Sequence, residues 1–450
     1  MVKLLRWVRG SVNLCHVRWK KLNKSFKRPE RALVIGCHGG VARAFLTLLN
    51  KSEVGQKLRD RFEKFVLVDQ APQPDEPVSF EGTYLPPMSI NNIDVFVRLL
   101  KEHKITHVID LSSIDTVECT HACDELGVDF LCTSIEEWPG AEPTPTDKAI
   151  ARILPPIKPQ LLNQSHLVGS GANPGIVNAL VFEAIEQFAQ RVGVEPTVPA
   201  LELNSAFITE IDTTEAVGMS FSENEFPITW SPSHCIEELF EPRAFYAVNT
   251  RTMGLPHRPV DRYYRVRCGD RFIDGMVVPH EEVKTLARKL PDVEVAFIYR
   301  LPPATMRALE ASSTRSKSED WKPRRLCPPW TRNLVGEDCL GVLLNSRRYG
   351  EFWLGFATDV KKGLALGTNA TELQVAAGVL AGLEQLGEVK GLHFVEDLDH
   401  KRFIRTVTEI LGPLKAVCDV NAPSMRIADR VINKPEFKSQ GMQVKTGLSV

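Results

Sequence analysis

The chain has 450 residues, of which 43% are hydrophobic and 25% are charged. This composition is ordinary for a globular protein, and the length exceeds what one hydrophobic core organises, so two or three domains are expected. The net charge is −1 at pH 7, but the first 28 residues carry nine Lys and Arg and no acid. The remainder is therefore acidic, which argues against a nucleic-acid-binding protein.

The basic segment 1–28 interleaves its cations with Leu, Val and Trp. Three interpretations stay open: a disordered cationic extension, a mitochondrial targeting peptide, and a helix resting on anionic lipid. No stretch of about 18 consecutive apolar residues occurs, so no transmembrane helix is predicted. The ten cysteines form no CxxC pair, and we predict neither a metal site nor a disulfide. We expect a cytoplasmic protein, with mitochondrial or membrane-surface association through segment 1–28 as the alternative.

The first half of the chain alternates predicted strands with predicted helices. After an apolar strand, a glycine-rich turn and a helix within 31–50, strands are predicted at 64–70, 106–113 and 129–135 and helices at 92–105 and 116–128. This alternation indicates a Rossmann-like, doubly wound parallel sheet covered on both faces.

The second half has a different pattern. Several β-type segments between about 198 and 305 indicate an α+β domain with a largely antiparallel sheet, and 369–386 has a strong helical period. Proline-rich and polar stretches suggest boundaries. The predicted parts are a basic extension (1–28), a Rossmann-like domain (29–155), an α+β domain (156–365, with a polar insertion at about 311–332), a C-terminal helical segment packing back on the core (366–425) and a tail (426–450).

A dinucleotide site is predicted where the first strand meets the first helix. Gly36, Gly39 and Ala42 have GxxGxxA spacing rather than the stricter GxGxxG, and Gly40 adds to the turn. Glycines let a diphosphate approach the backbone, and the helix N-terminus holds it. Asp69 ends the second strand, where an acid binds the adenosine ribose and disfavours NADP. The pattern predicts bound NAD, although a purely structural strand–helix turn has similar glycines.

A second glycine-rich turn, 169–175, lies directly before a long apolar run. Glycines allow close approach of a backbone to a ligand, and the first turn of a helix offers free N–H donors. We therefore expect a ligand near Asn173, without identifying it from the turn alone.

Three segments supply carboxylates, and two of them also carry a tryptophan: Glu136 and Glu137 lie beside Trp138, Trp230 lies eight residues before Glu238, and Glu210 occurs with Asp212. Acids beside indole rings suit a cationic ligand, because the acids neutralise its charge and the ring quadrupole attracts it. Taken singly, each acid fits a solvated surface and each tryptophan fits a core. Together they favour a polyamine-like substrate over an amino acid, since these segments lack Arg or Lys to bind a carboxylate.

Nine segments resemble bacterial-type homospermidine synthase, a family related to saccharopine dehydrogenase, and occur in its order: IEEWPG, GANPGIV, ITEIDTT, EFPITWSPSHCIEELFEP, CLGVLLN, EFWLGF, NATELQVAAGVLAG, EDLDHKRF and LGPLKAV. The resemblance extends from about residue 31 to 423, and it implies that 29–155 is an NAD-binding domain and that 156–365 serves catalysis and dimerisation. It implies an NAD-dependent homodimer in which putrescine is oxidatively deaminated, a second amine (putrescine or spermidine) forms a Schiff base, and the imine is reduced to homospermidine.

The resemblance also implies roles for individual residues. Asn173 resembles the family's asparagine between cofactor and substrate, and Trp230 resembles the indole that stabilises a cationic imine. Glu136, Glu210 and Glu238 resemble the acids that hold the diamine. With a gap in the alignment, Asp115 resembles a further substrate-facing acid.

One departure concerns a histidine. Where relatives have a segment like VHYAYHP, this chain has VAFIYRLPPA, so Ala296 or Arg300 stands where the histidine is expected. Arg300 is therefore a candidate substrate-binding residue. Two alternatives stay open, a reductase of the saccharopine or carboxynorspermidine type acting on a carboxylated amine, and a catalytically silent NAD-binding relative.

Overall fold

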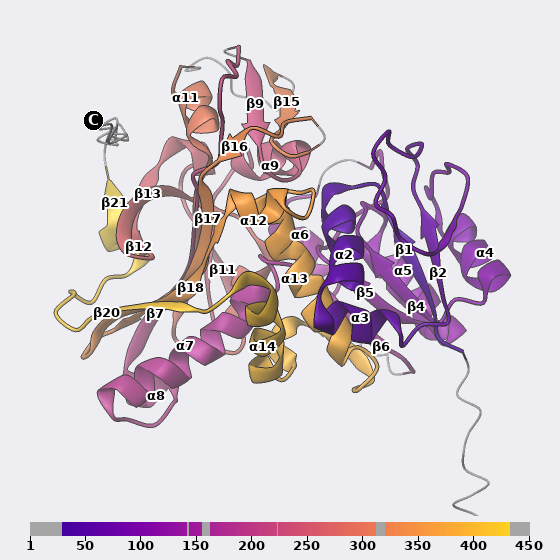
Figure 1. The fold of residues 1–450 in the computed structure, drawn as a ribbon. Coiled ribbons are helices and arrows are strands. Elements are labelled where there is room, and N and C mark those ends of the chain that lie inside the picture. The colour runs from indigo at the N-terminus through magenta and orange to yellow at the C-terminus, as the bar shows by residue number, and fades with distance from the viewer. Residues whose placement is uncertain are drawn as a thin grey trace, which may run out of the picture.

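The computed structural model describes residues 29–141, 144–154, 163–222, 224–311, 320–328 and 330–432. Within these residues, a seven-stranded parallel sheet and a larger mixed sheet lie side by side (Figure 1). The basic segment 1–28 and most of the predicted tail lie outside the described residues. No helix in the described part of the chain is long and apolar enough to cross a membrane.

The parallel sheet has the strand order β19-β6-β5-β4-β1-β2-β3. Its strands are β1 (Arg31–Ile35), β2 (Lys64–Val68), β3 (Thr83–Tyr84), β4 (His107–Asp110), β5 (Asp129–Cys132), β6 (Ser165–Leu167) and β19 (Gly391–His393). The central strands are buried apolar runs, as a sheet covered on both faces requires. This confirms the predicted Rossmann-like fold.

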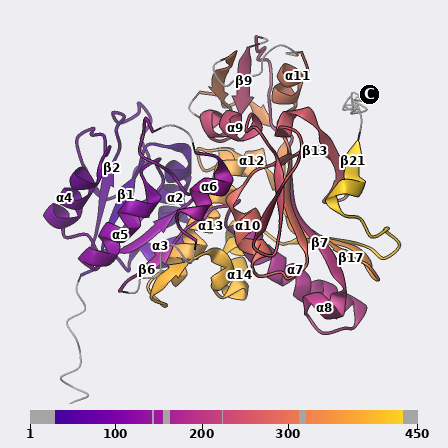
Figure 2. The same ribbon diagram turned by 180° about the vertical axis from the view of Figure 1, so that it is seen from behind.

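Helices cover both faces of this sheet (Figures 1 and 2). The helices of this first body are α2 (Gly40–Lys51), α3 (Glu53–Arg59), α4 (Ile93–His103), α5 (Thr116–Leu126) and α6 (Thr146–Ala151). Along β1, Val34 packs in the core that contains α2, whereas Leu33 packs in the core that contains α4 and α5. The alternation follows from the period of two in a strand.

Two strands of the parallel sheet come from beyond the predicted end of the first domain. β6 follows the predicted limit at residue 155, and β19 comes from the predicted C-terminal helical segment. The parallel sheet therefore combines three of the predicted parts, and the limits between these parts remain a prediction.

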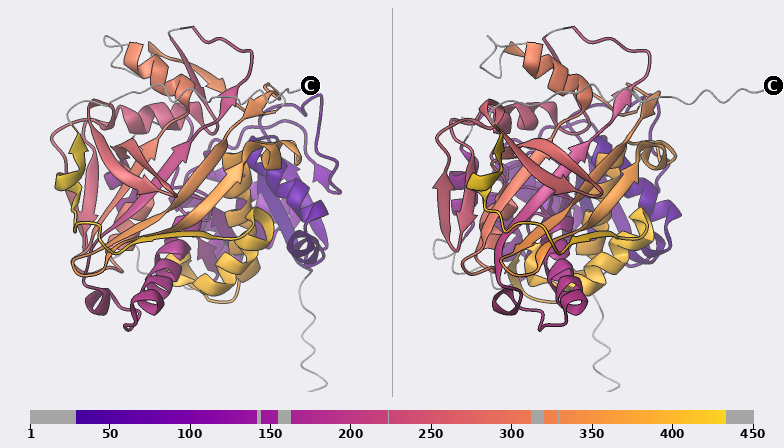
Figure 3. Two further views of the ribbon diagram at one scale, coloured as in Figure 1. Left: turned by 60° about the vertical axis from the view of Figure 1, so that its left-hand side comes forward. Right: turned by 90° about the vertical axis from the view of Figure 1, so that its left-hand side faces the viewer.

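The larger sheet has ten strands, with the main order β20-β18-β17-β7-β14-β13-β12-β21. In the right-hand view of Figure 3 this sheet lies in front of the parallel sheet. These strands, with the flanking pair β10 and β11, are β7 (Leu203–Asp212), β10 (Phe245–Val248), β11 (Arg251–Gly254), β12 (Tyr263–Cys268), β13 (Arg271–Val278), β14 (Glu294–Arg300), β17 (Glu337–Ser346), β18 (Gly350–Asp359), β20 (Lys415–Asp419) and β21 (Val431–Ile432). Only the β14–β7 pairing among them is parallel, which confirms a largely antiparallel second sheet.

Short strand pairs and further helices complete the second body. β9 (Glu225–Ile228) pairs with β15 (Lys322–Arg325), and β8 (Glu215–Ala216) pairs with β16 (Leu334–Val335). The helices are α7 (Ile176–Val192), α8 (Val198–Leu201), α9 (Pro232–Leu239), α10 (Glu281–Ala287), α11 (Pro303–Ala311), α12 (Val360–Leu364), α13 (Ala370–Gln385) and α14 (His400–Leu411).

Helix α13 lies between the two sheets (Figures 1 and 2). It is apolar on all sides, and nearly every residue in it is buried, as expected for a helix with protein all round. A Cβ atom at Gly378 would lie 1.9 Å from the carbonyl oxygen of Gly171. The helix therefore holds the glycine-rich turn 169–175 by direct backbone contact.

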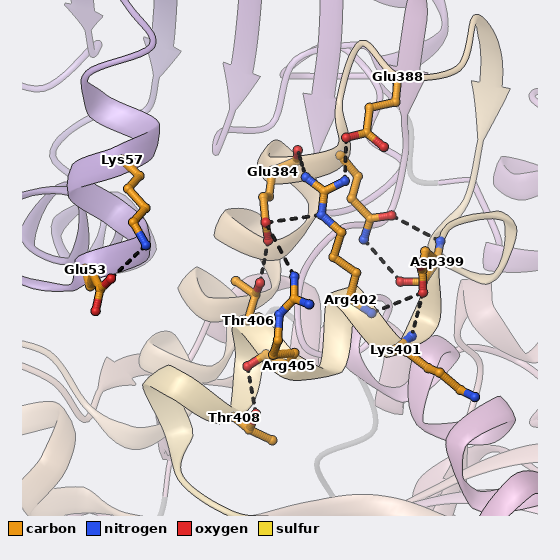
Figure 4. A network of polar contacts seen from close by, with 11 residues as sticks. Glu53, Lys57, Glu384, Glu388, Asp399, Lys401, Arg402, Arg405, Thr406 and Thr408 are labelled. Carbon is orange, nitrogen blue, oxygen red and sulfur yellow. Dashed lines mark hydrogen bonds and ion pairs between the residues drawn. The ribbon is translucent and has the colours of Figure 1, made fainter.

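Helix α14 is fastened to the end of α13 by a polar network (Figure 4). Arg402 donates to the Glu384 carbonyl oxygen at 2.9 Å and to its Oε1 at 3.1 Å, and it also pairs with Glu388. Asp399 accepts from the backbone N–H groups of Lys401 and Arg402 at the start of α14. The network fixes the C-terminal end of α13, whose N-terminal end faces the cleft described below.

The contact between Gly378 and Gly171 predicts the effect of a small substitution. An alanine normally stabilises a helix interior by about 1 kcal/mol relative to glycine. Gly378→Ala should instead lower the free energy of unfolding, because its methyl group meets backbone that cannot move aside. Gly382→Ala, whose Cβ meets the Ser170 side chain, is the matched variant and should cost less. Urea denaturation measures both, and a Gly378→Ala protein as stable as the wild type would contradict the packing.

Candidate functional site

A cleft of about 1580 Å³ lies between the two bodies, at the carboxyl ends of the parallel strands. Open α/β sheets bind ligands at this edge. Ten carboxylate residues and two arginines line it within the described part of the chain: Asp69, Asp75, Glu76, Glu136, Glu137, Glu237, Glu238, Glu241, Glu281 and Glu372, with Arg43 and Arg325. The balance of charge favours a cationic ligand over an anionic one in most of the cleft.

The first glycine turn forms one end of the cleft. Gly36 has a φ of +74°, and a Cβ there would lie 2.5 Å from the Leu111 carbonyl oxygen, so a larger residue does not fit. Gly36 and Gly39 line the cleft, and Gly39 caps α2. Gly40 and Ala42 lie behind the cleft lining: a Cβ at Gly40 would lie 1.9 Å from the Glu372 carboxylate, and Ala42 is buried within α2.

Asp69 fixes the geometry of this end of the cleft. Its Oδ2 accepts the backbone N–H of His38 at 2.9 Å, and its Oδ1 accepts that of Ala71 at the same distance. The carboxylate thus joins the glycine turn to the loop after β2 while it faces the cleft. This is where an acid contacts the ribose in a dinucleotide fold.

Two arginines reach the start of α2 from different bodies. Arg43 extends from α2, and Arg325 extends from β15 and lies 3.5 Å from Glu372 Oε1. The Nε atoms of both arginines are buried without a hydrogen-bond partner among the described residues. Burial raises the pKa of Glu372, and the two guanidinium groups oppose this rise. Unsatisfied cationic donors beside a glycine turn fit the diphosphate of a dinucleotide.

The other end of the cleft is built around His280, which ends the segment after β13 and caps α10. Its Nδ1 contacts the Glu282 carboxylate and lies 3.5 Å from Glu281 Oε2, while its Nε2 lies 3.9 Å from Glu238 Oε1. The amide nitrogen of Asn173, oriented so that both its polar atoms are satisfied, donates to Glu282 Oε1 at 2.7 Å. The second glycine turn is thereby joined to the acidic cluster.

These contacts set the charges at this end of the cleft. Burial disfavours the imidazolium of His280, but the carboxylates around it, Glu282 foremost, raise its pKa to about 10. Burial raises the pKa of Glu238 well above its ordinary value, although His280 opposes this. The ligand atoms of His280, Glu281 and Glu282 lie within 4.8 Å of one another, close enough to hold a cation.

Trp230 and Glu136 face the same end of the cleft. Trp230 is partly buried between β9 and α9 and lines the cleft. Glu136, beyond β5, accepts a hydrogen bond from Ser134 Oγ at 2.7 Å and lies 3.5 Å from Nε2 of His234. Burial raises the pKa of Glu136, an effect that His234 opposes. An indole and several partly desolvated carboxylates thus surround one space, as a site for an amine requires.

Glu210 lies beneath this space rather than on the cleft wall. It is buried on β7, where the Asn173 side chain is a hydrogen-bonding neighbour. Burial, followed by the nearby charge of Asp212, raises its pKa to about 8. The structure therefore gathers Asn173, Glu210, Trp230 and Glu238 into one region, with Glu210 in its floor.

Two predicted residues lie apart from this region. Asp115 caps α5 by accepting the backbone N–H of Glu118 at 2.8 Å, and it pairs with Arg152 at 2.6 Å. Arg300 ends β14 and donates to the Asp274 carbonyl oxygen at 2.9 Å. Neither belongs to the residues that line the cleft.

The sequence analysis missed His280, Arg325 and Glu372. The segment VVPHEE carried a usable signal, because a histidine and two acids directly follow a buried strand at a sheet edge. Arg325 follows the polar insertion and Glu372 belongs to a helical pattern, so neither carried a local signal. Their place depends on how α13 and β15 pack against α2.

Comparisons with known proteins agree with this fold. No family model matches the chain. The chain is 26% identical over 365 residues to homospermidine synthase from Blastochloris viridis, spanning 69% of this chain and 74% of that protein. It is 25% identical over 357 residues to homospermidine synthase from Mesorhizobium japonicum, spanning 67% and 73%. The predicted resemblance to homospermidine synthases is confirmed.

Solved structures show the same architecture. Homospermidine synthase from Legionella pneumophila, in complex with NAD, superposes with a TM-score of 0.73 at 19% identity and covers 91% of this chain and 98% of that one. Saccharopine dehydrogenase (L-Glu forming) from Saccharomyces cerevisiae superposes with a TM-score of 0.51 at 10% identity, covering 86% and 100%. The chain thus has the saccharopine dehydrogenase-like fold.

The raised pKa of His280 predicts a dependence of stability on pH. Below about pH 6.5 both the folded and unfolded states bind this proton, so its stabilising contribution is complete. Between 6.5 and about 10 only the folded state binds it, so stability falls with rising pH. His280→Gln should flatten this fall in urea denaturation at pH 6, 8 and 9.5. His234→Gln is the matched control, and equal slopes in wild type and His280→Gln would contradict the ion-paired imidazolium.

Proposed function

We propose that the protein is an NAD-dependent homospermidine synthase whose substrate is putrescine. The observation that carries the proposal is the pairing, within one cleft, of a glycine turn with Asp69 and a carboxylate cluster with Trp230. Such a cleft binds a dinucleotide at one end and an amine at the other. The names of the similar proteins support the same activity.

The residues at the first glycine turn fit NAD. Gly36 and Gly39 give the diphosphate access to the start of α2, Asp69 faces the ribose position, and Arg43 and Arg325 offer unsatisfied donors. The bound dinucleotide would supply a reversible hydride acceptor. The acid at Asp69 favours NAD over NADP, because it would repel a 2′-phosphate.

The residues at the other end bind and deprotonate the amine. An ammonium group must lose a proton before its carbon can be oxidised, and the Glu238 carboxylate, which His280 helps to keep ionised, is the base for this proton. Glu136 neutralises a second ammonium. Trp230 stabilises the positively charged imine through its ring face, which offers no nucleophile.

The overall change is balanced without an external oxidant. One putrescine loses its terminal nitrogen as ammonia, the second forms a C=N bond to that carbon, and the hydride removed in the first step reduces the C=N bond. Two putrescine molecules thus give homospermidine and ammonia. The closed redox cycle requires that amine and imine occupy one space, which Trp230, Glu238 and Asn173 enclose.

The placement of Arg300 bears on the alternative substrate, a carboxylated amine. Such a substrate needs a cation free to pair with its carboxylate beside the amine region. The His280 imidazolium already pairs with Glu282, and Arg300 donates to the Asp274 carbonyl oxygen away from the cleft wall. The two lining arginines, Arg43 and Arg325, lie at the glycine turn among the described residues. This distribution favours an unsubstituted diamine.

The family resemblance further leads us to propose a cytoplasmic homodimer that also accepts spermidine as the second amine. Light scattering tests the dimer, and competition between spermidine and putrescine tests the second amine.

Isotope-labelled putrescine tests the activity directly. Purified protein with NAD should release ammonia and form labelled homospermidine without accumulating NADH, as read by mass spectrometry and absorbance. Trp230→Ala should lose most of the turnover yet keep its bound NAD, because the ring acts on the imine. Bound NAD without any product from the wild type would refute putrescine as the substrate. Equal loss of NAD from Trp230→Ala would refute the role of the ring.

Arg325 provides a separate test of cofactor binding. Arg325→Gln should weaken binding of NAD and ADP at least about ten-fold, the size of one charge-assisted hydrogen bond, and leave adenosine binding unchanged. Calorimetry with the three ligands measures this. Arg332→Gln, which removes a surface ion pair with Glu76, is the control. An equal loss for adenosine would mean that Arg325 only supports the structure.

A further inference from the structure

Behind Trp230 and Glu210 lies a buried set of four oxygen-bearing side chains that the mechanism above does not use. Asp212 is on β7, Asp338 is opposite it on β17, Thr229 precedes Trp230, and Thr371 is in the first turn of α13. Their exposed fractions are 1%, 0%, 0% and 7%. Burying two carboxylates side by side is costly unless their charge is reduced or compensated.

The four side chains form a continuous line of short contacts. Thr229 Oγ1 lies 2.5 Å from Asp212 Oδ2, Thr371 Oγ1 lies 2.5 Å from Asp338 Oδ2, and the two hydroxyl oxygens are 3.1 Å apart. The line therefore runs from Asp212 through Thr229 and Thr371 to Asp338. All three distances are within hydrogen-bonding range.

The number of hydrogens on this line determines its protonation. Each threonine hydroxyl carries one hydrogen, so the two threonines supply two hydrogens for three contacts. If both acids were ionised, each hydroxyl would donate to its own carboxylate and no hydrogen would lie between Thr229 and Thr371. One added proton, on either acid, fills all three contacts. A second added proton would leave one donor without an acceptor along the line.

The surroundings favour the single added proton. Asp212 keeps a further hydrogen bond at Oδ1 from the backbone N–H of Thr214 at 2.8 Å, whereas Asp338 Oδ1 has no partner among the described residues. Among the described residues, Glu210 on β7, Tyr299 on β14 and Cys339 on β17 are titratable neighbours of the two acids. None of these three is a cation, and a shared proton reduces the charge of the pair.

We propose that Asp212 and Asp338 share one proton through Thr229 and Thr371, and that this one-proton relay sets the charge beneath Glu210 and Trp230. Transfer moves the proton on Asp338 to Thr371, the hydroxyl proton of Thr371 to Thr229, and that of Thr229 to Asp212. No atom is gained or lost, and the pair keeps one negative charge. The four are positioning residues, since none contacts the proposed substrate.

The consequence for the site is electrostatic and rests on the proposed function. Two negative charges beneath Glu210 would oppose its ionisation more than one does, so the shared proton lets Glu210 carry charge at a lower pH. The single remaining charge still attracts an ammonium or iminium group held at Trp230. The relay thereby couples the protonation of a buried pair to the cationic state of the substrate.

A double-mutant cycle tests the proton count without any substrate. In Asp338→Asn or Asp212→Asn, the new amide donates to its threonine and the line ends on the remaining carboxylate, so each single variant should melt at or above the wild-type temperature. In the double variant one amide turns its oxygen toward its threonine, so its three contacts are filled as well, without any shared proton. Between pH 6 and 8 the wild type should therefore lose stability with rising pH by one proton more than the three variants, which should share one slope.

The other outcomes of the cycle overturn the proposal. If both acids were ionised, the wild type and all three variants would share one slope. If both were protonated, the slope would fall by one proton in each single variant and by two in the double variant. Should an Asn variant fail to fold, infrared spectroscopy of the wild type, Thr371→Ser and Thr371→Val decides. The C=O stretching band of the protonated acid should be alike in the wild type and Thr371→Ser and shifted in Thr371→Val. Identical spectra for all three proteins would refute the relay.

The pH–rate profile then connects the relay to turnover. Thr371→Val should shift the acidic limb of the profile relative to Thr371→Ser, which keeps the hydroxyl. If the melting and infrared results hold but no variant makes homospermidine, the proposed function fails and the relay stands. If turnover is normal and the acidic limb of the pH–rate profile is the same in Thr371→Val and Thr371→Ser, the relay has no effect on Glu210.

Discussion

The packing of α13 between the two sheets is the constraint on which the cleft depends. Because Gly378 has no side chain, the helix contacts the backbone of Gly171 directly and fixes the turn that carries Asn173. The N-terminal turn of the same helix supplies Thr371 to the buried pair and Glu372 to the start of α2. One helix therefore sets the distance between the dinucleotide end and the amine end.

The cleft divides its charges by position. Near the glycine turn, Arg43 and Arg325 offer donors that the protein leaves unsatisfied, which suits an anion. Near Trp230, acids gather around His280, and burial raises the pKa values of Glu136 and Glu238. A dinucleotide and a diamine carry opposite charges, so this division orients the two ligands with their reactive ends together.

His280 places an imidazole in the site, although the chain lacks the histidine that relatives have near position 296 or 300. Ala296 or Arg300 stands where a histidine was expected, and Arg300 donates to the Asp274 carbonyl oxygen rather than lining the cleft. His280 comes instead from the segment after the neighbouring strand β13, and it contacts Glu238 and Glu282. An imidazole is thus present in the site, supplied by a different element.

The sequence by itself determined the parallel sheet, the glycine turn with Asp69, and the resemblance that gathered Asn173, Glu210, Trp230 and Glu238. These depend on local patterns: apolar runs, turn residues and short motifs whose physics acts within a few residues. The tertiary structure alone decided that Glu372 meets Gly40, that Arg325 reaches the start of α2, that Asp115 and Arg300 lie apart, and that Asp212 faces Asp338. Each of these contacts joins residues far apart in the chain, and only strand pairing and helix packing bring such residues together.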